Sequence, residues 1–313
     1  MTSLKGFQLL PARLEDVPAL ADISAASFET DAHTEVKSYG RSPFDMRAYS
    51  LSSLPSELAN PRIRVIKAVE EGTGAIMGFC TWGFRGGDPP PLPPLGDDDL
   101  GEPNVGIKVV PEAETKEESR AQGGGGGGNG HGESATREES TEQVRVPKTK
   151  TETEAEEEKE KEEEKKDSDP IARLEALTSQ DFKRWMEAIM PEPEKGNTKN
   201  NKPKVSCLFV IGLYVSPGFQ RRGVGSALLS WGTDLVDLRG DDCFAWVHSS
   251  AGAWLVYEKA GFRTARTLDV DLDAYAPAAA VGRGREKGGR WGRYVFRYMV
   301  YGSLPEGVGA MPF

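Results

Sequence analysis

The apolar positions of this 313-residue chain change their spacing several times, and each spacing predicts a different element. Short apolar runs bounded by turn residues predict strands at 7–10, 63–69 and 75–84. Glu and Gly residues at 70–74 separate the last two runs, which is typical of a β-hairpin.

Helical spacing begins soon after the first strand. Asp16 is the predicted N-cap of a helix, because Pro18 stands in the first turn and apolar residues follow at helical intervals. Between residues 30 and 60 the sequence predicts helical fragments that are interrupted at Pro43, Pro55 and Pro61.

The second half of the chain alternates between the two periodicities. An amphipathic helical face comes first, made by Phe182, Trp185, Met186 and Ile189. Strands and helices then alternate, which predicts one α/β domain with a central sheet flanked by helices. The predicted elements are a strand at 205–215, a helix at 222–238, a strand at 243–248, a helix at 252–260, and strands at 263–272 and 290–301.

A segment of different character, 86–169, separates these halves. It contains a proline-rich stretch, a glycine tract and a dense Glu/Lys run, and it has few large apolar residues. Such a segment buries too little apolar area to offset the entropy of ordering it, so we predict a disordered insertion. Segments 1–85 and 170–313 then share one core of roughly 230 residues.

Charge and cysteine usage narrow the function classes. The net charge is −10, and the chain lacks the basic stripe that nucleic-acid binding requires. No apolar run is long enough to cross a bilayer, and no signal-peptide pattern is present, so we expect a cytosolic or nuclear protein. Cys80, Cys207 and Cys243 are expected to be buried free thiols.

A C-terminal basic patch is expected to be a solvated loop. It consists of Arg283, Arg285, Lys287, Arg290 and Arg293.

One stretch carries a chemical signal: a predicted buried strand runs into a turn that opens a helix. Glycines at 223 and 225 remove side chains where a ligand must approach the backbone closely. The free amides of the first helical turn and the helix dipole favour phosphate, and Arg221 and Arg222 add positive charge. The helix is expected to bury Val224, Leu228, Trp231, Leu235 and Leu238.

Two common nucleotide-binding turns do not fit. A Walker P-loop needs Gly-Lys-Ser/Thr, which is absent, and a dinucleotide fingerprint needs a third glycine where Leu228 stands. The pattern Gln-x-x-Gly-x-Gly after a strand ending in Leu-x-Val-x-Pro instead resembles the coenzyme A loop of the GNAT acetyltransferase superfamily. Residues 250–262 resemble a later segment of that family, Leu-Tyr-x-Lys-x-Gly-Phe, with Val256 where Leu is usual.

The resemblance implies the GNAT fold, a mixed and mostly antiparallel sheet flanked by helices, and it is nearest to fungal-type members. It implies acetyl-CoA as acyl donor and an unidentified amine as acceptor. The implied coenzyme A contacts are Leu213, Tyr214, Val215, Gln220, Arg221, Arg222, Gly223, Val224, Gly225, Ser226 and Ser250, the last replacing a usual Asn.

The resemblance also implies catalytic groups. Tyr257 stands where the family places the tyrosine that protonates the coenzyme A thiolate, although a core tyrosine has the same helical spacing. His248 is a candidate general base because its ordinary pKa suits proton abstraction, yet fungal-type relatives carry Glu there and a lone strand-end His is more often structural. The acidic rivals are Glu29, Asp31 and Glu35.

Three functions therefore remain open at this point. The first is an N-acetyltransferase acting on a small-molecule or peptide amine. The second is a non-catalytic module that binds acyl-CoA as a regulatory ligand. The third is a scaffold whose acidic insertion binds a basic protein partner.

Overall fold

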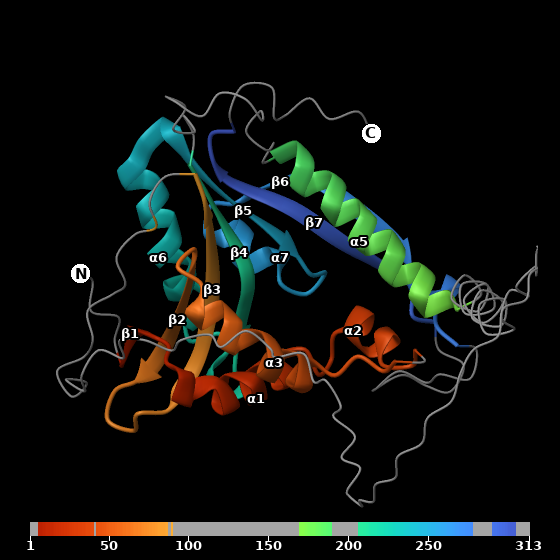
Figure 1. Cartoon of the computed structure of the whole chain (residues 1–313), viewed down its shortest axis with the longest axis horizontal. Helices are drawn as coiled ribbons and strands as arrows, with labels where there is room; N and C mark the ends of the chain where they lie inside the picture. The colour runs from red at the N-terminus through yellow and green to blue at the C-terminus, as the bar shows by residue number, and fades with distance from the viewer. Residues whose placement is uncertain are drawn as a thin grey trace, which may run out of the picture. The chain divides into compact units, whose positions relative to one another are not determined.

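The structure is a computed structural model that describes residues 6–40, 42–86, 89, 169–189, 206–277 and 290–304. Nearly all of the predicted insertion at 86–169 lies outside the described residues, and so does most of the C-terminal basic patch. The described part forms one sheet with helices on both faces (Figure 1).

The sheet has seven strands in the order β1-β2-β3-β4-β5-β7-β6. All neighbouring strands are antiparallel except β4 and β5, which are parallel because helix α6 carries the chain across the sheet between them. Every predicted strand is present, and the α/β fold class is confirmed. The strands are β1 (Phe7–Pro11), β2 (Ile63–Glu70), β3 (Ile76–Arg85), β4 (Ser206–Val215), β5 (Cys243–Ser249), β6 (Arg263–Asp271) and β7 (Arg293–Gly302).

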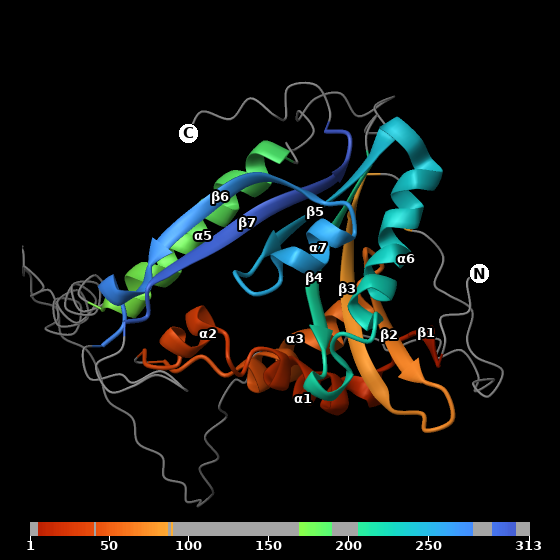
Figure 2. The same cartoon turned by 180° about the vertical axis from the view of Figure 1, so that it is seen from behind.

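The helices divide between the two faces. One face carries α1 (Val17–Ser27), α2 (Ala32–Lys37), α3 (Met46–Ala59) and α5 (Pro170–Ile189), as Figure 1 shows. The other face carries α6 (Val224–Arg239) and α7 (Trp254–Lys259), seen in front of the strands in Figure 2.

Two helix predictions need correction. Pro55 does not interrupt a helix, because it lies inside α3. Leu51, Leu54 and Leu58 of α3 pack into an apolar cluster with α1 and the sheet, and this burial outweighs the hydrogen bond that the proline removes.

One position of the predicted apolar stripe of α6 is also wrong, while Val224 and Leu228 are buried as expected. Leu238 is 81% exposed, whereas Ala227, Gly232 and Val236 are buried. Gly232 has a packing reason, since a β-carbon there would lie 2.4 Å from the Trp82 ring. A small residue thus lets α6 approach the sheet closely.

The three cysteines are buried free thiols, as the sequence predicts. No cluster of metal-ligating side chains occurs among the described residues. In the same part of the chain, no helix is both long and apolar enough to cross a membrane.

Candidate active site

The central feature of the site is an opening between β4 and β5. Their parallel ladder runs from Ser206 opposite Cys243 to Val210 opposite Val247 and then stops. β4 continues to Val215, paired only with β3, and β5 continues to Ser249, paired only with β7. Figure 2 shows the two strands diverging, with α7 following the end of β5.

The backbone of β4 exposes hydrogen-bonding groups to this opening. The Ser216 amide donates to the Met77 carbonyl of β3 at 2.9 Å. Because successive amides alternate sides along a strand, Tyr214 N–H also faces β3, whereas Leu213 and Val215 N–H face the opening. Two of the three predicted coenzyme A contacts on β4 therefore direct their amides to where a ligand could lie, and Tyr214 does not.

A β-bulge lies beside the opening. Thr81 pairs with Gly212 and Trp82 with Val210, so Ile211 is an extra residue without a partner on β3. Ile211 is 41% exposed. Bulges occur next to active sites because they change the direction in which side chains point. Here Tyr214 packs in the cluster with α1 and α3, and Leu213 and Val215 pack on the α6 side.

The turn after β4 has the geometry of an anion site. Arg221 and Gly223 both have positive φ, 61° and 84°, and α6 starts at Val224. The first intrahelical bond joins Ala227 N–H to the Gly223 carbonyl at 3.0 Å, so the amides from Gly223 to Ser226 precede it. Such amides, together with the positive end of the helix dipole, bind phosphate.

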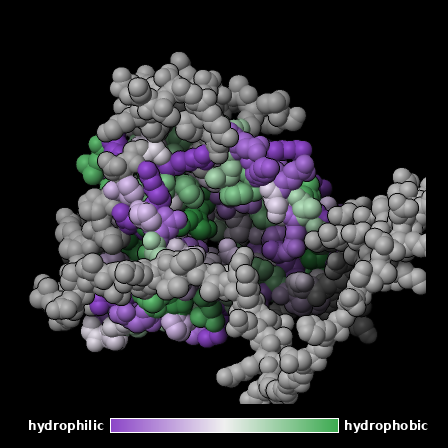
Figure 3. Space-filling model, viewed as in Figure 1, coloured by the Kyte–Doolittle hydropathy of each residue, from purple (hydrophilic) through white to green (hydrophobic). Residues whose placement is uncertain are grey.

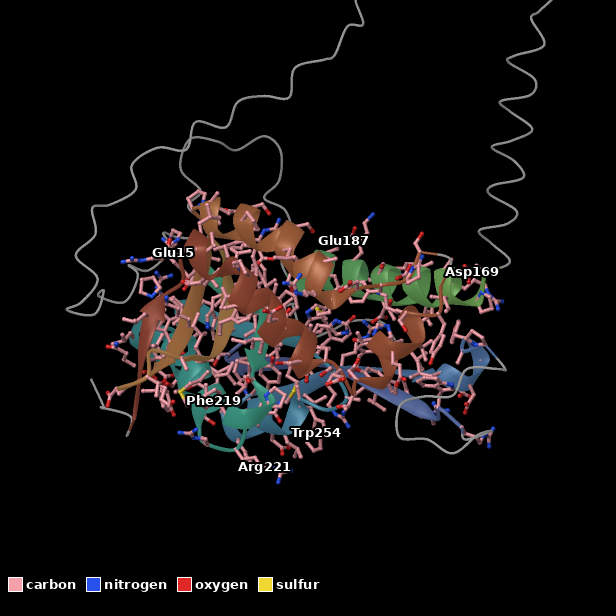
Figure 4. The ribbon with its side chains drawn as sticks, turned by 90° about the horizontal axis from the view of Figure 1, so that it is seen from below. Glu15, Asp169, Glu187, Phe219, Arg221 and Trp254 are labelled. Carbon is pink, nitrogen blue, oxygen red and sulfur yellow. The ribbon has the colours of Figure 1, made fainter. Side chains whose placement is uncertain are left out.

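The side chains of the turn have different roles. Gln220 donates from Nε2 to the Val215 carbonyl at 3.1 Å and thereby closes the turn. Arg222 pairs with Glu70 of β2 at 3.0 Å. Arg221 has no ion-pair partner among the described residues and points outward, beside Phe219 and on the face opposite α5 (Figure 4). Of the two predicted phosphate-binding arginines, only Arg221 is therefore available without breaking an ion pair.

Tyr257 lies on α7 next to this turn. Its neighbour Val256 approaches within 3.4 Å of the position that a β-carbon on Gly225 would take, so α7 packs against the start of α6. Tyr257 is 4% exposed and belongs to the apolar core. Burial raises the pKa of its hydroxyl well above the ordinary value, so the group is protonated at neutral pH.

His248 and Ser250 lie at the end of β5. The His248 ring stacks between aromatic groups, 4.5 Å from the Tyr298 ring and 4.9 Å from the Phe296 ring. Its Nε2 is buried and has no hydrogen-bond partner among the described residues. Burial lowers the His248 pKa to about 4, which makes the imidazole a weak base. The Ser250 side chain hydrogen-bonds Tyr294.

Each of the predicted acidic rivals lies on α2 or between α1 and α2. Asp31 accepts the Thr34 amide at 2.9 Å as the N-cap of α2, and it also accepts the Tyr294 hydroxyl at 2.7 Å. Glu29 is exposed at the end of α1, and Glu35 lies within α2.

Sequence reasoning missed a pocket on the face that carries α1 and α3. It lies beside the bulge, where Ile211, Gly212 and Tyr214 of β4 face Ser53 and Glu57 of α3. Figure 3 shows this face hollowed near its centre. A helix running through Pro55 places residues 50, 53, 54 and 57 on one face, whereas a helix end at Pro55 would hide this shared face.

Comparison with known proteins agrees with this geometry. The acetyltransferase (GNAT) family model matches residues 152–262, from before α5 to just after α7. The chain carries a GNAT acetyltransferase domain. A comparison with curated protein sequences finds no match.

The GNAT domain also resembles solved structures, at low identity. A mosquito arylalkylamine N-acetyltransferase is 15% identical, with 94% of this chain and 98% of that chain covered and a TM-score of 0.43. A Drosophila melanogaster polyamine N-acetyltransferase is 14% identical, with 95% and 100% covered and a TM-score of 0.44. Arabidopsis thaliana NAA60 is 11% identical, with 94% and 97% covered and a TM-score of 0.39. None of these likenesses bears on the substrate of this chain.

Proposed function

We propose that this protein is an N-acetyltransferase that transfers the acetyl group of acetyl-CoA to a primary amine. The observation that carries the proposal is the continuity of the strand opening with the amide-lined turn. The turn offers an anion site at the start of α6, and the opening offers unpaired amides within the same sheet. A long ligand with a diphosphate at one end and a thioester at the other fits both.

The donor is held by backbone groups. The amides from Gly223 to Ser226 bind the diphosphate, and Arg221 adds charge. The Leu213 and Val215 amides bind the pantetheine arm along β4 and polarise the thioester carbonyl, since oriented N–H groups stabilise the oxyanion of the transition state. Much of the acceleration then comes from fixing the thioester beside the amine.

Tyr257 is the proton donor to the leaving group. When the amine nitrogen attacks the thioester carbon, the carbon–nitrogen bond forms and the carbon–sulfur bond breaks. The departing thiolate needs a proton, and the Tyr257 hydroxyl on α7, which is protonated at neutral pH, supplies it. The tyrosinate then recovers a proton from the nitrogen or from solvent.

Calorimetric titration of coenzyme A into the full-length protein tests the donor site. We expect saturable binding, followed by amine-dependent release of thiol when acetyl-CoA is mixed with a panel of primary amines. Tight coenzyme A binding without thiol release from any amine would instead favour a non-catalytic acyl-CoA module. Absence of any binding heat would refute the donor site itself.

The 86–169 segment is tested separately. Deletion of these residues leaves acetyl transfer intact if the segment serves only as a docking tail for a basic protein. Loss of partner binding with retained transfer separates the two functions, and loss of transfer assigns the segment to the enzyme.

A further inference from the structure

The phosphate-binding turn at residues 220–223 has a backbone conformation that its own residues do not favour. Arg221 is the one residue other than glycine with a positive φ in the described part of the chain, at 61°, and Gly223 follows at 84°. A side chain is crowded in this left-handed region, so the conformation persists only where neighbouring contacts hold it. All four residues are exposed, and burial therefore does not supply these contacts.

Two side chains fasten the turn. Gln220 donates from Nε2 to the Val215 carbonyl at 3.1 Å, a bond within the strand–turn unit itself. Arg222 donates from Nη2 to Glu70 Oε1 at 3.0 Å, and its guanidinium lies 5.1 Å from the centre of the Phe219 ring. The Arg222 contact therefore ties the turn to β2, a strand formed by a distant part of the chain.

Glu70 is the fixed member of this ion pair. It ends β2, and its backbone closes the β2–β3 hairpin through hydrogen bonds with Gly74 and Ala75. Its second carboxylate oxygen accepts the Thr73 hydroxyl at 2.8 Å. The Glu70 side chain is 21% exposed, whereas that of Arg222 is 51% exposed. Hydrogen bonds from Thr73 and Arg222 lower the pKa of Glu70, so the carboxylate is ionised at neutral pH and can hold the arginine.

Glu70 lies away from the opening between β4 and β5. In the sheet order, β3 and then β2 lie on one side of β4, and β5 lies on the other. Arg222 is therefore drawn towards the side of β4 that the opening does not occupy. Arg221 points outward instead (Figure 4). The two neighbouring arginines are thus suited to separate tasks, one to hold the backbone and the other to supply charge to a ligand.

We propose that Glu70 is a positioning residue for the donor site. By holding Arg222 it keeps Arg221 and Gly223 in the left-handed conformation, which presents the amides from Gly223 to Ser226 to a diphosphate. The inference rests on the proposed acetyl-CoA site and adds to it a residue from another part of the sheet. Because folding already orders the turn, coenzyme A loses less entropy of ordering when it binds, and its affinity is higher.

The sign of the effect distinguishes positioning from simple charge. A carboxylate near an anion site repels the anion, so removal of its charge alone should strengthen coenzyme A binding. Loss of a positioning contact should weaken it. Glu70→Ala is therefore expected to lower the affinity for coenzyme A by about 2- to 5-fold, measured by calorimetric titration of the full-length protein.

Glu71→Ala is the matched control. It removes the neighbouring carboxylate, which is exposed and takes part in no ion pair within the described part of the chain. The affinity of this variant for coenzyme A should not fall, because it loses a negative charge at the same hairpin and keeps the contact between Glu70 and Arg222.

A double-mutant cycle tests whether Glu70 acts through Arg222. Arg222→Ala is expected to lower the affinity for coenzyme A, and adding Glu70→Ala to it should cause no further loss. Both side chains are partly exposed, so urea unfolding of the same samples should give nearly unchanged midpoints. In turnover assays, Glu70→Ala should raise KM for acetyl-CoA and leave kcat unchanged, because it weakens binding equally in the ground and transition states.

Three results would overturn the inference. The first is a Glu70→Ala protein that binds coenzyme A as tightly as the natural protein or more tightly. The second is an equal loss of affinity from Glu70→Ala with and without Arg222. The third is a loss of affinity accompanied by a large drop in the unfolding midpoint. In each case the natural protein still binds coenzyme A and the donor site stands, whereas absence of binding by the natural protein refutes the proposed function itself.

Discussion

Gly225 offers a direct test of the phosphate-binding turn, because the fold has room for a side chain there and the proposed ligand does not. Gly225 is the second residue of α6. A β-carbon on it would lie 3.4 Å from Val256 Cγ2 and 3.7 Å from Val215 Cγ2, which are ordinary contacts. Gly225→Ala is therefore expected to raise the free energy of unfolding by about 0.5–1 kcal/mol, since alanine is the better helix former.

The same methyl group projects from the turn whose amides are proposed to hold the diphosphate. Losing one hydrogen bond to a charged group costs about 1.5–3 kcal/mol, which is roughly a 10- to 150-fold loss of affinity. Calorimetric titration of coenzyme A measures this loss, and urea unfolding of the same sample measures stability. Gly218→Ala is the matched control, because a β-carbon at Gly218 meets nothing within 4 Å and Gly218 precedes the turn.

The result that refutes this reasoning is a Gly225→Ala protein that is stable and binds coenzyme A as tightly as the natural protein. The diphosphate would then lie elsewhere. A protein that loses both stability and binding would contradict the packing around Gly225 and not the ligand argument.

Three further changes test other parts of the structure. Tyr257→Phe is expected to lower kcat by about 10²- to 10⁴-fold, with the affinity for coenzyme A unchanged. If assays of thiol release give the same kcat for both proteins, Tyr257 is not the proton donor. The Lys67 ammonium lies 2.8 Å from the Asp16 carboxylate, and both side chains are 11% exposed. Asp16→Ala therefore leaves Lys67 buried without its ion-pair partner. Urea unfolding should show a loss of about 3–5 kcal/mol, and a loss below about 1 kcal/mol would show that Lys67 reaches water. His248 has its pKa lowered from 6.5 to about 4, so its contribution to stability is present above pH 6.5 and is lost as the pH falls towards 4. His248→Phe should make stability less dependent on pH between 7.5 and 5, and an identical pH dependence in the two proteins would contradict the burial of the imidazole.

The strand–turn–helix unit could be predicted from the sequence because its signals are local. The apolar run of β4, the glycines of the turn and the apolar spacing of α6 occupy one continuous stretch. The opening between β4 and β5 could not be predicted in the same way, since strand separation depends on pairing with residues far along the chain. In the sequence, only the family resemblance indicates this opening between β4 and β5.

Pro55 shows how one residue can hide a pocket from sequence reasoning. Pro55 favours a helix end by local rules, yet packing of Leu54 against α1 and the sheet keeps α3 continuous. Once the helix continues, Ser53 and Glu57 are one turn apart and face the same pocket. Proline does favour a helix end locally, but burial of the apolar face of α3 stabilises the continuous helix more.

Arg222 illustrates a tertiary contact that no spacing rule reveals. Its sequence position beside Gly223 favours a phosphate contact, but its partner Glu70 is 152 residues away in the chain. Gln220 likewise donates to the Val215 carbonyl, so this side chain of the motif stabilises the backbone of the turn. Motif residues of this kind act by holding the backbone in shape.

The burial of Cys80, Cys207 and Cys243 makes a simple colorimetric assay possible. These are all the cysteines of the chain, and each is at most 5% exposed. Burial raises the pKa of Cys80 well above 9 and that of Cys207 to about 12, so little reactive thiolate forms near neutral pH. A disulfide dye such as Ellman's reagent would therefore report any free coenzyme A continuously, with little background from the folded protein, and a rising background would signal unfolding.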